Sequence, residues 1–187
     1  MKIVIGADKL GYHLKEAVKS YLRRRDIEVE DYGVNDAEGE TPYYQVASTV
    51  AQKISSGEFR KGILVCGTGM GMAIIANKHP GVYAAVCETR LAAEKSRSIN
   101  DSNILTLGGL ITKPEVAGEI VDTWLETEFT QGWEPSIVEW LHNSKEDIAR
   151  IEEERLKQVI ESLYSLYNKL FEEVIEKIYR KVFTEMP

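Results

Sequence analysis

Short apolar segments alternate with amphipathic segments along the chain up to about residue 130. Five runs of apolar or β-branched side chains, each followed by a turn signal or a helical pattern, predict strands at residues 2–7, 27–32, 62–66, 82–87 and 103–107. Between the strands, apolar positions recur at helical spacing, as at Leu14, Ala17, Val18 and Leu22. This alternation of strand and helix favours an α/β fold, with a parallel sheet covered by helices on both faces.

A long helix is predicted at the end of the chain. After a shorter helix expected over residues 114–128, the sequence Ser-Lys-Glu-Asp at 144–147 has the pattern of a capping box, and no glycine or proline follows before Pro187. These signals predict a helix of about 40 residues. Its apolar positions form one stripe: Leu156, Ile160, Leu163, Tyr167, Leu170, Val174, Ile178 and Val182.

A stripe of this length is too long for one small domain to bury. We therefore expect the helix to pack against itself as a hairpin or against a partner chain. The change of pattern divides the chain into a domain at residues 1–143 and a helical extension at residues 144–187, which we expect to serve oligomerisation.

Charge and composition narrow the classes of partner. The 187 residues include 23 basic and 30 acidic side chains, a net charge of −7, which disfavours non-specific binding of nucleic acid. No stretch approaches the roughly 20 apolar residues of a membrane span, and the first apolar run is too short for a signal peptide. Cys66 and Cys87 each end an apolar run, which suits two thiols on different strands in a reducing compartment. We expect a cytoplasmic protein with no nucleic-acid or membrane partner.

The segment after the third predicted strand carries the candidate chemistry, because ligands bind beyond the carboxyl ends of parallel strands. Residues 66–72 read Cys-Gly-Thr-Gly-Met-Gly-Met, and their glycines allow backbone N–H groups to converge at the start of a helix. Such a loop suits a phosphate or an enediolate, although many α/β folds use one only to turn tightly. Cys66 favours the chemical interpretation, since a thiol beside converging amides can act as a base or nucleophile. Cys87 is interpreted as structural.

The same segment resembles a known family. Residues 62–78, Gly-Ile-Leu-Val-Cys-Gly-Thr-Gly-Met-Gly-Met-Ala-Ile-Ile-Ala-Asn-Lys, are similar to the type B ribose-5-phosphate isomerases and the galactose-6-phosphate isomerase subunits. Further matches fall at residues 6–8, 11, 14–15, 31–33, 43, 96–97, 100, 103 and 107–108. The resemblance implies a Rossmann-like three-layer sandwich with a five-stranded parallel sheet. It also implies a homodimer or higher oligomer with active sites between subunits.

The resemblance implies roles for individual residues as well. Cys66 would move a proton between C1 and C2 of a small sugar phosphate, while Thr68 and the loop amides would stabilise the cis-enediolate. Asp8 and Asn100 would contact the sugar hydroxyls. The other positions expected to bind substrate are Lys9, Tyr43, Gly67, Gly69, Met70 and Gly71. No cofactor is implied, and a metal site is not expected because no second cysteine or acid stands at ligand spacing.

Three departures from the family pattern bear on the substrate. Lys9 stands where the family has histidine, and it could hold a phosphate as a point charge or be simply solvated. Ile99 stands at the place of the family's ring-opening histidine and cannot transfer a proton. The arginines that help to bind phosphate are replaced by Gln-Gly-Trp-Glu-Pro-Ser-Ile at residues 131–137.

Several hypotheses accommodate these departures. A four-carbon substrate such as erythrulose 4-phosphate has no hydroxyl able to close a stable ring, so it would not need the histidine. The alternatives are one subunit of a heteromer, like the B subunit of galactose-6-phosphate isomerase, and a non-catalytic scaffold. The intact cysteine loop favours an enzyme over a scaffold. A nucleotide-binding protein is disfavoured because the full dinucleotide fingerprint is missing and Cys66 would be unexplained.

Overall fold

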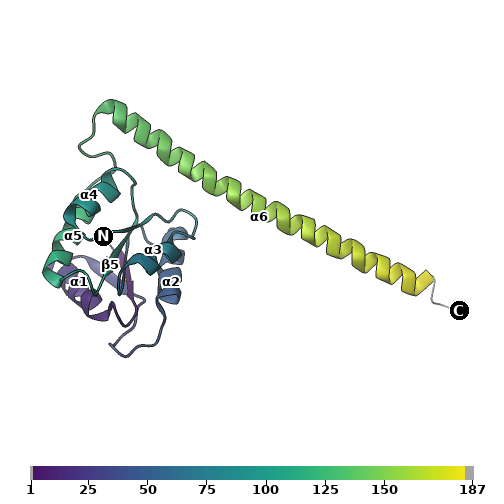
Figure 1. The fold of residues 1–187 in the computed structure, drawn as a ribbon, viewed down its shortest axis with the longest axis horizontal. Helices are drawn as coiled ribbons and strands as arrows, with labels where there is room; N and C mark the ends of the chain where they lie inside the picture. The colour runs from purple at the N-terminus through teal and green to yellow at the C-terminus, as the bar shows by residue number, and fades with distance from the viewer. Residues whose placement is uncertain (1, 184–187) are drawn as a thin grey trace. The chain divides into compact units, whose positions relative to one another are not determined.

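The computed structural model describes residues 2–183, with side chains up to residue 180. Strands and helices alternate as the sequence predicts (Figure 1). In chain order the elements are β1 (Lys2–Ala7), α1 (Tyr12–Arg24), β2 (Glu28–Asp31), α2 (Tyr43–Ser55), β3 (Gly62–Cys66), α3 (Met70–Ala76), β4 (Ala84–Val86), α4 (Arg90–Ser98), β5 (Ile104–Gly108), α5 (Pro114–Glu126) and α6 (Pro135–Phe183).

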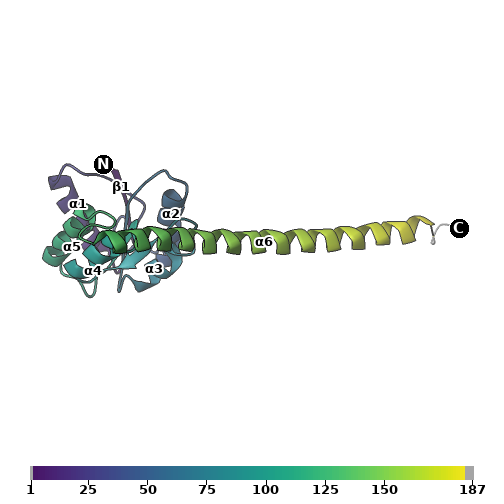
Figure 2. The same ribbon diagram turned by 90° about the horizontal axis from the view of Figure 1, so that it is seen from above.

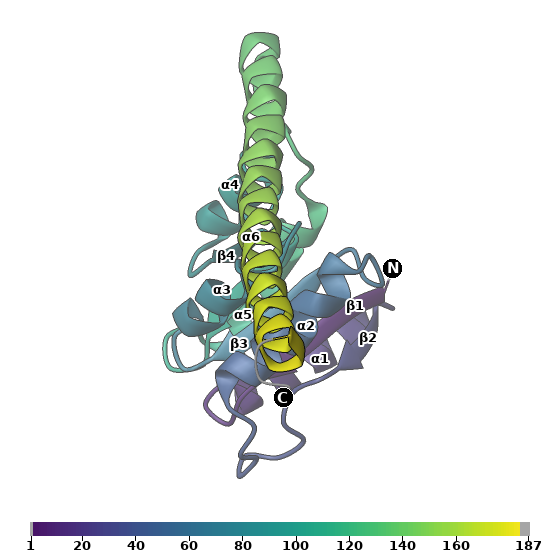
Figure 3. The ribbon, with the colours of Figure 1, turned by 90° about the vertical axis from the view of Figure 1, so that its right-hand side faces the viewer.

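All five strands form one parallel sheet in the order β2-β1-β3-β5-β4, and β1 and β2 can be seen side by side in Figure 3. Every residue of the central strand β3 is buried, as expected of a strand covered on both faces. One core joins the sheet to α1, α4 and α5, and a second core joins its other face to α2 and α3 (Figure 1). The predicted five-stranded, three-layer α/β fold is therefore confirmed.

A fully buried lysine ties α1 to the edge of the sheet. The Nζ of Lys15 lies 2.8 Å from Oδ2 of Asp31 and donates to the backbone oxygen of Val34 at 2.5 Å. Lys19 approaches the same carboxylate oxygen at 2.5 Å. Burial raises the pKa of Asp31, but the hydrogen bonds from Lys15 and Lys19 outweigh this effect and leave the pKa below its ordinary value. The network holds the end of β2 and the loop after it against α1.

The last helix begins earlier than the sequence predicts. The structure starts α6 at Pro135, so residues 144–147 lie inside the helix and are not its cap. Proline suits the first position of a helix, and the amides of Ile137 and Val138 donate to the oxygen of Glu134. No glycine or proline interrupts the helix after Pro135, and α6 runs as one element (Figure 2).

The chain divides into two compact units, Met1–His142 and Asn143–Pro187. The first holds the sheet and its covering helices. In the second, the predicted apolar stripe is exposed at each described position from Leu156 to Ile178. The side chain of Val182 and residues 184–187 lie outside the described part of the chain.

The substitution Lys15→Met tests the buried network. It should lower the free energy of unfolding by about 3 kcal/mol, because it leaves a buried carboxylate without its main partner. Lys19→Met is the matched control and should cost less, about 1 kcal/mol, since the Lys19 side chain is partly exposed. Urea unfolding measures both losses.

The pH dependence gives a second readout of the same pair. Because folding lowers the pKa of Asp31, the stabilisation is fully present above about pH 4 and is lost as the pH falls through the folded-state pKa. The difference between wild type and Lys15→Met should therefore shrink in acid. A loss no greater in Lys15→Met than in Lys19→Met would contradict this account.

Candidate active site

Three loops meet at the carboxyl edge of the sheet, after the neighbouring strands β1, β3 and β5. A Cβ atom on Gly11 would lie only 2.2 Å from the backbone oxygen of Val65, and one on Gly109 only 2.4 Å from that of Leu10. The amide of Gly109 donates to the backbone oxygen of Cys66 at 2.7 Å. Backbone therefore packs directly on backbone, and the three loops behave as one unit.

Cys66 ends β3 and lies at the centre of this unit. Its side chain is almost fully buried, and its Sγ accepts a hydrogen bond from the amide of Gly69 at 3.2 Å. Gly69 has φ of +77° and precedes α3, so the chain reverses there and returns its amide to the sulfur. Only Cys66 places a thiol at the meeting point of the three loops.

The rest of the glycine loop leads from Cys66 into the first turn of α3. Thr68 is exposed, and its Oγ1 accepts from the amide of Met70 at 3.4 Å. Met70, Gly71 and Met72 form the first turn of α3, whose amides have no carbonyl partner one turn earlier within the helix. A ligand oxygen held against this turn would meet N–H donors from more than one residue.

Asp8 and Lys9 follow β1 at the same edge. Asp8 is buried, and its Oδ1 accepts from the amide of Gly11 at 3.0 Å. Burial raises the pKa of Asp8, and the backbone hydrogen bonds from Gly11 and Leu10 and the charge of Lys9 only partly offset it. Lys9 itself is exposed. The loop after β1 thus brings a buried acid to the edge of the sheet where Cys66 lies, with an exposed lysine as the next residue.

Tyr43, at the start of α2, also reaches the glycine loop. A Cβ atom on Gly71 would lie 2.8 Å from the ring of Tyr43, so the glycine makes room for the aromatic side chain. The ring is 40% exposed and borders the mouth of the site. The structure thus brings Tyr43 to the glycine loop after β3.

Asn100 is not brought to Cys66 within one chain. It follows α4, close to Asn103, whose backbone oxygen accepts from the amide of Gly62 at the start of β3. Cys66 lies at the far end of the same strand, about 13 Å further along at the usual rise per residue. Ile99 shares the location of Asn100, away from the cysteine loop.

Two leucines at the mouth were missed by the sequence analysis. A Cβ atom on Gly67 would lie 3.2 Å from the side chain of Leu10 and 3.3 Å from that of Leu110, so the two side chains flank the loop. Both leucines are more than half exposed. Their position directly after the ends of β1 and β5 was the available signal, because residues there border a ligand site in a parallel sheet.

The second cysteine has a different environment. Cys87 is 1% exposed within the core beneath α1, α4 and α5, and burial raises the pKa of its thiol. Both cysteines are free thiols.

In the described residues no group of three or more histidine, cysteine or acidic side chains could hold a metal ion. Over the same part of the chain no helix is long and apolar enough to cross a membrane.

Comparison with known proteins relates the chain to sugar isomerases. The Ribose/Galactose Isomerase family matches residues 3–141. The 4-deoxy-4-sulfo-D-erythrose isomerase of Clostridium sp. (strain MSTE9) is 51% identical over 153 residues, which are 82% of this chain and 96% of that protein. The D-erythrulose-4-phosphate isomerase of Pectobacterium atrosepticum is 41% identical over 133 residues, 71% of this chain and 87% of that protein. The structure of Clostridium thermocellum ribose-5-phosphate isomerase B matches with a TM-score of 0.75 at 41% identity, over 83% of this chain and 99% of that chain.

The pair Gly69→Ala and Gly57→Ala tests the packing of the cysteine loop. Both glycines have φ of +77°, so alanine should cost each about 1 kcal/mol of stability from the backbone alone. Space around Gly57 is open, whereas a Cβ on Gly69 would lie 3.0 Å from the backbone of Leu107. Gly69→Ala should therefore lose at least about 1 kcal/mol more in chemical unfolding. Equal losses would show that the loop yields without strain.

Proposed function

We propose that Cys66 is the catalytic base of this chain, which belongs to the Ribose/Galactose Isomerase family. The proposed substrate is a four-carbon sugar with an anionic group on C4. The general reaction is an aldose–ketose isomerisation of a small sugar phosphate, as in the relatives named for erythrulose 4-phosphate and ribose 5-phosphate. A further relative is named for 4-deoxy-4-sulfo-D-erythrose. The observation that carries the assignment is the thiol of Cys66, the only one among the described residues that lies where three strand ends meet.

The reaction moves one proton between neighbouring carbons. The Cys66 thiolate removes the proton from C2 of the aldose, which leaves a cis-enediolate with negative charge on the oxygen at C1. The same thiol then returns a proton to C1, while the hydroxyl proton at C2 is transferred to the oxygen at C1. The product is the ketose, and Cys66 is regenerated as thiolate.

The glycine loop is suited to the charged intermediate. The amide of Gly69 donates to the sulfur, and the first turn of α3 follows directly, so the enediolate oxygen on C1 would accept from amides of this turn and from the Thr68 hydroxyl. Asp8, whose Oδ1 accepts from the amide of Gly11, would contact sugar hydroxyls, as the family resemblance implies. Leu10 and Leu110 narrow the mouth of the loop and limit the access of water.

Ile99 supports a substrate that needs no ring opening. An aldotetrose closes a five-membered ring only through the oxygen on C4, and an anionic group at C4 removes that hydroxyl. The carbonyl is then free when the sugar binds, and a proton-transferring side chain at position 99 is unnecessary. Two relatives are named for substrates of this kind, one a sulfonate and one a phosphate.

The charge of the site favours the sulfonate. Lys9 is the cation next to Asp8, and residues 131–137 contain no arginine. A sulfonate carries one negative charge at neutral pH, whereas a phosphate ester carries between about 1.5 and 2. One lysine therefore balances 4-deoxy-4-sulfo-erythrose more fully than erythrulose 4-phosphate, which is the second candidate substrate.

The proposal includes a second copy of the chain. Asn100 lies at the opposite edge of the sheet from Cys66, so the contact with sugar that the family resemblance implies would come from a neighbouring subunit. A homodimer or higher oligomer is accordingly part of the proposed functional state. Two free thiols support a reducing, cytoplasmic setting.

Replacement of the proposed base gives the first test. Cys66→Ala should lower kcat by at least about 10²-fold and abolish incorporation of solvent deuterium at C1 of the product, because the shared base is gone. Cys87→Ala should retain turnover, and circular dichroism should show that both variants fold. Near-normal turnover of Cys66→Ala would refute the role of the thiol.

A substrate panel tests the chain length and the anion. For 4-deoxy-4-sulfo-erythrose, kcat/KM should exceed that for erythrulose 4-phosphate by about 10-fold and that for ribose 5-phosphate by at least about 10²-fold, differences within the range of active-site discrimination. Lys9→Met should raise KM for both four-carbon substrates more than it lowers kcat, the signature of lost uniform binding. A preference for ribose 5-phosphate would contradict the proposed substrate class.

A further inference from the structure

The second unit of the chain presents an apolar face that the isomerase domain does not explain. Apolar side chains are exposed along much of α6, and six of those that are more than half exposed share one face: Leu156, Ile160, Leu163, Tyr167, Leu170 and Val174. The family match ends at residue 141, and the solved relative is covered over 99% of its length by 83% of this chain. A contiguous face of this size on a soluble chain indicates a binding surface.

The spacing of the six residues is that of a coiled coil. They follow one another at intervals of 4, 3, 4, 3 and 4 residues, so they occupy alternating a and d positions of a heptad. Glu153 occupies the next position at the N-terminal end, and Lys177 occupies the next one at the C-terminal end. The strict heptad therefore holds six apolar residues between an acid and a base, and the wider apolar stripe continues beside Lys177 at the exposed Ile178.

We propose that this seam pairs with the same seam of a second copy in antiparallel orientation. Centred on Ser165, the pairing places Leu156 against Val174, Ile160 against Leu170 and Leu163 against Tyr167 of the partner helix. Glu153 of each copy then faces Lys177 of the other, once at each end. All six apolar residues are used in both copies, and the charges that bound the block are matched.

The parallel alternative conflicts with the same residues. In a parallel, in-register pair Glu153 would face Glu153 and Lys177 would face Lys177. Like charges would then meet at both ends of the apolar block. Any shift of register by a whole heptad would remove apolar pairs from the block. Charge and apolar pattern therefore favour the same antiparallel register.

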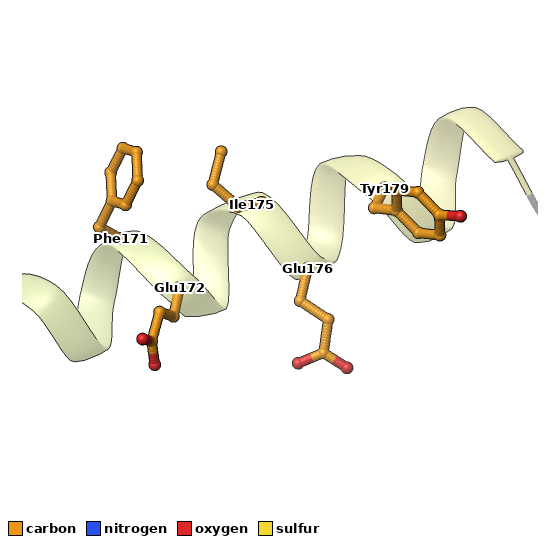
Figure 4. Close-up of a pocket in the computed structure, with 5 residues that line it drawn as sticks. All are labelled: Phe171, Glu172, Ile175, Glu176 and Tyr179. Carbon is orange, nitrogen blue, oxygen red and sulfur yellow. The ribbon is translucent and has the colours of Figure 1, made fainter.

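The residues of α6 outside the seam are consistent with association between protein chains. Figure 4 shows Phe171 and Ile175 pointing to one side of α6, while Glu172 and Glu176 point to the other. Over residues 156–180 the helix carries four acidic and four basic side chains: Glu161, Glu172, Glu173, Glu176, Lys157, Lys169, Lys177 and Arg180. A helix that lies on a lipid surface has a basic polar face, so the balance disfavours a membrane as the occupant.

Charge reversal in the full chain tests the orientation. Glu153→Lys and Lys177→Glu should each raise the dissociation constant of the α6-dependent association by at least about 10-fold, because each creates like-charge contacts at both ends of the antiparallel pair. The double variant Glu153→Lys/Lys177→Glu should restore association to near the wild-type value. Sedimentation equilibrium measures the three constants.

Two further chains complete the experiment. Glu176→Lys is the matched control, since Glu153 and Glu176 each form an exposed i, i+4 ion pair within α6, but Glu176 lies outside the seam. Its association should be unchanged. A chain ending at Asn143 should lose only the association that depends on α6. If the two seam variants associate as tightly as wild type, or if the shortened chain sediments as the same species, the antiparallel pairing is refuted whatever the substrate proves to be.

Discussion

Close packing of backbone at the carboxyl edge of the sheet is the constraint on which the site depends. Gly11 lies against the end of β3, and Gly109 lies against the loop after β1 while its amide binds Cys66. Neither position has room for even a methyl group. This backbone packing fixes the distance between Asp8 and Cys66, although no hydrogen bond joins the two side chains. The exposed side chains of the same loops are free to differ.

The chemistry that this edge supports needs few groups, and the chain has kept those few. Enolisation requires a base and hydrogen-bond donors for an enediolate oxygen. Binding of the substrate also requires a cation for the anionic group on C4. Cys66, the start of α3 and Lys9 can supply them. A substrate that cannot cyclise removes the need for a further proton transfer, so Ile99 is compatible with a working isomerase.

The sequence predicted the parts of the molecule that are governed by local pattern. Alternating apolar runs gave five strands and their layers, and the cysteine loop was located because glycines and a thiol are informative residue types. Leu10 and Leu110 were missed, since an exposed leucine has no signature until its neighbours in space are known. Asn100 was grouped with Cys66 through resemblance, although a strand's length separates them in one chain. The early start of α6 was missed because a capping-box pattern also occurs inside helices.

The crowded glycines have a consequence for how such a site diversifies. Positions 11, 69, 71 and 109 meet backbone or ring atoms at distances that exclude a larger residue, so the skeleton of the active site tolerates almost no variation. Variation is open at exposed side chains of this edge, such as Lys9, Leu10 and Leu110, which can change without disturbing the packed backbone. A new binding preference can therefore arise by exchange of a few surface side chains while the backbone of the three loops stays the same.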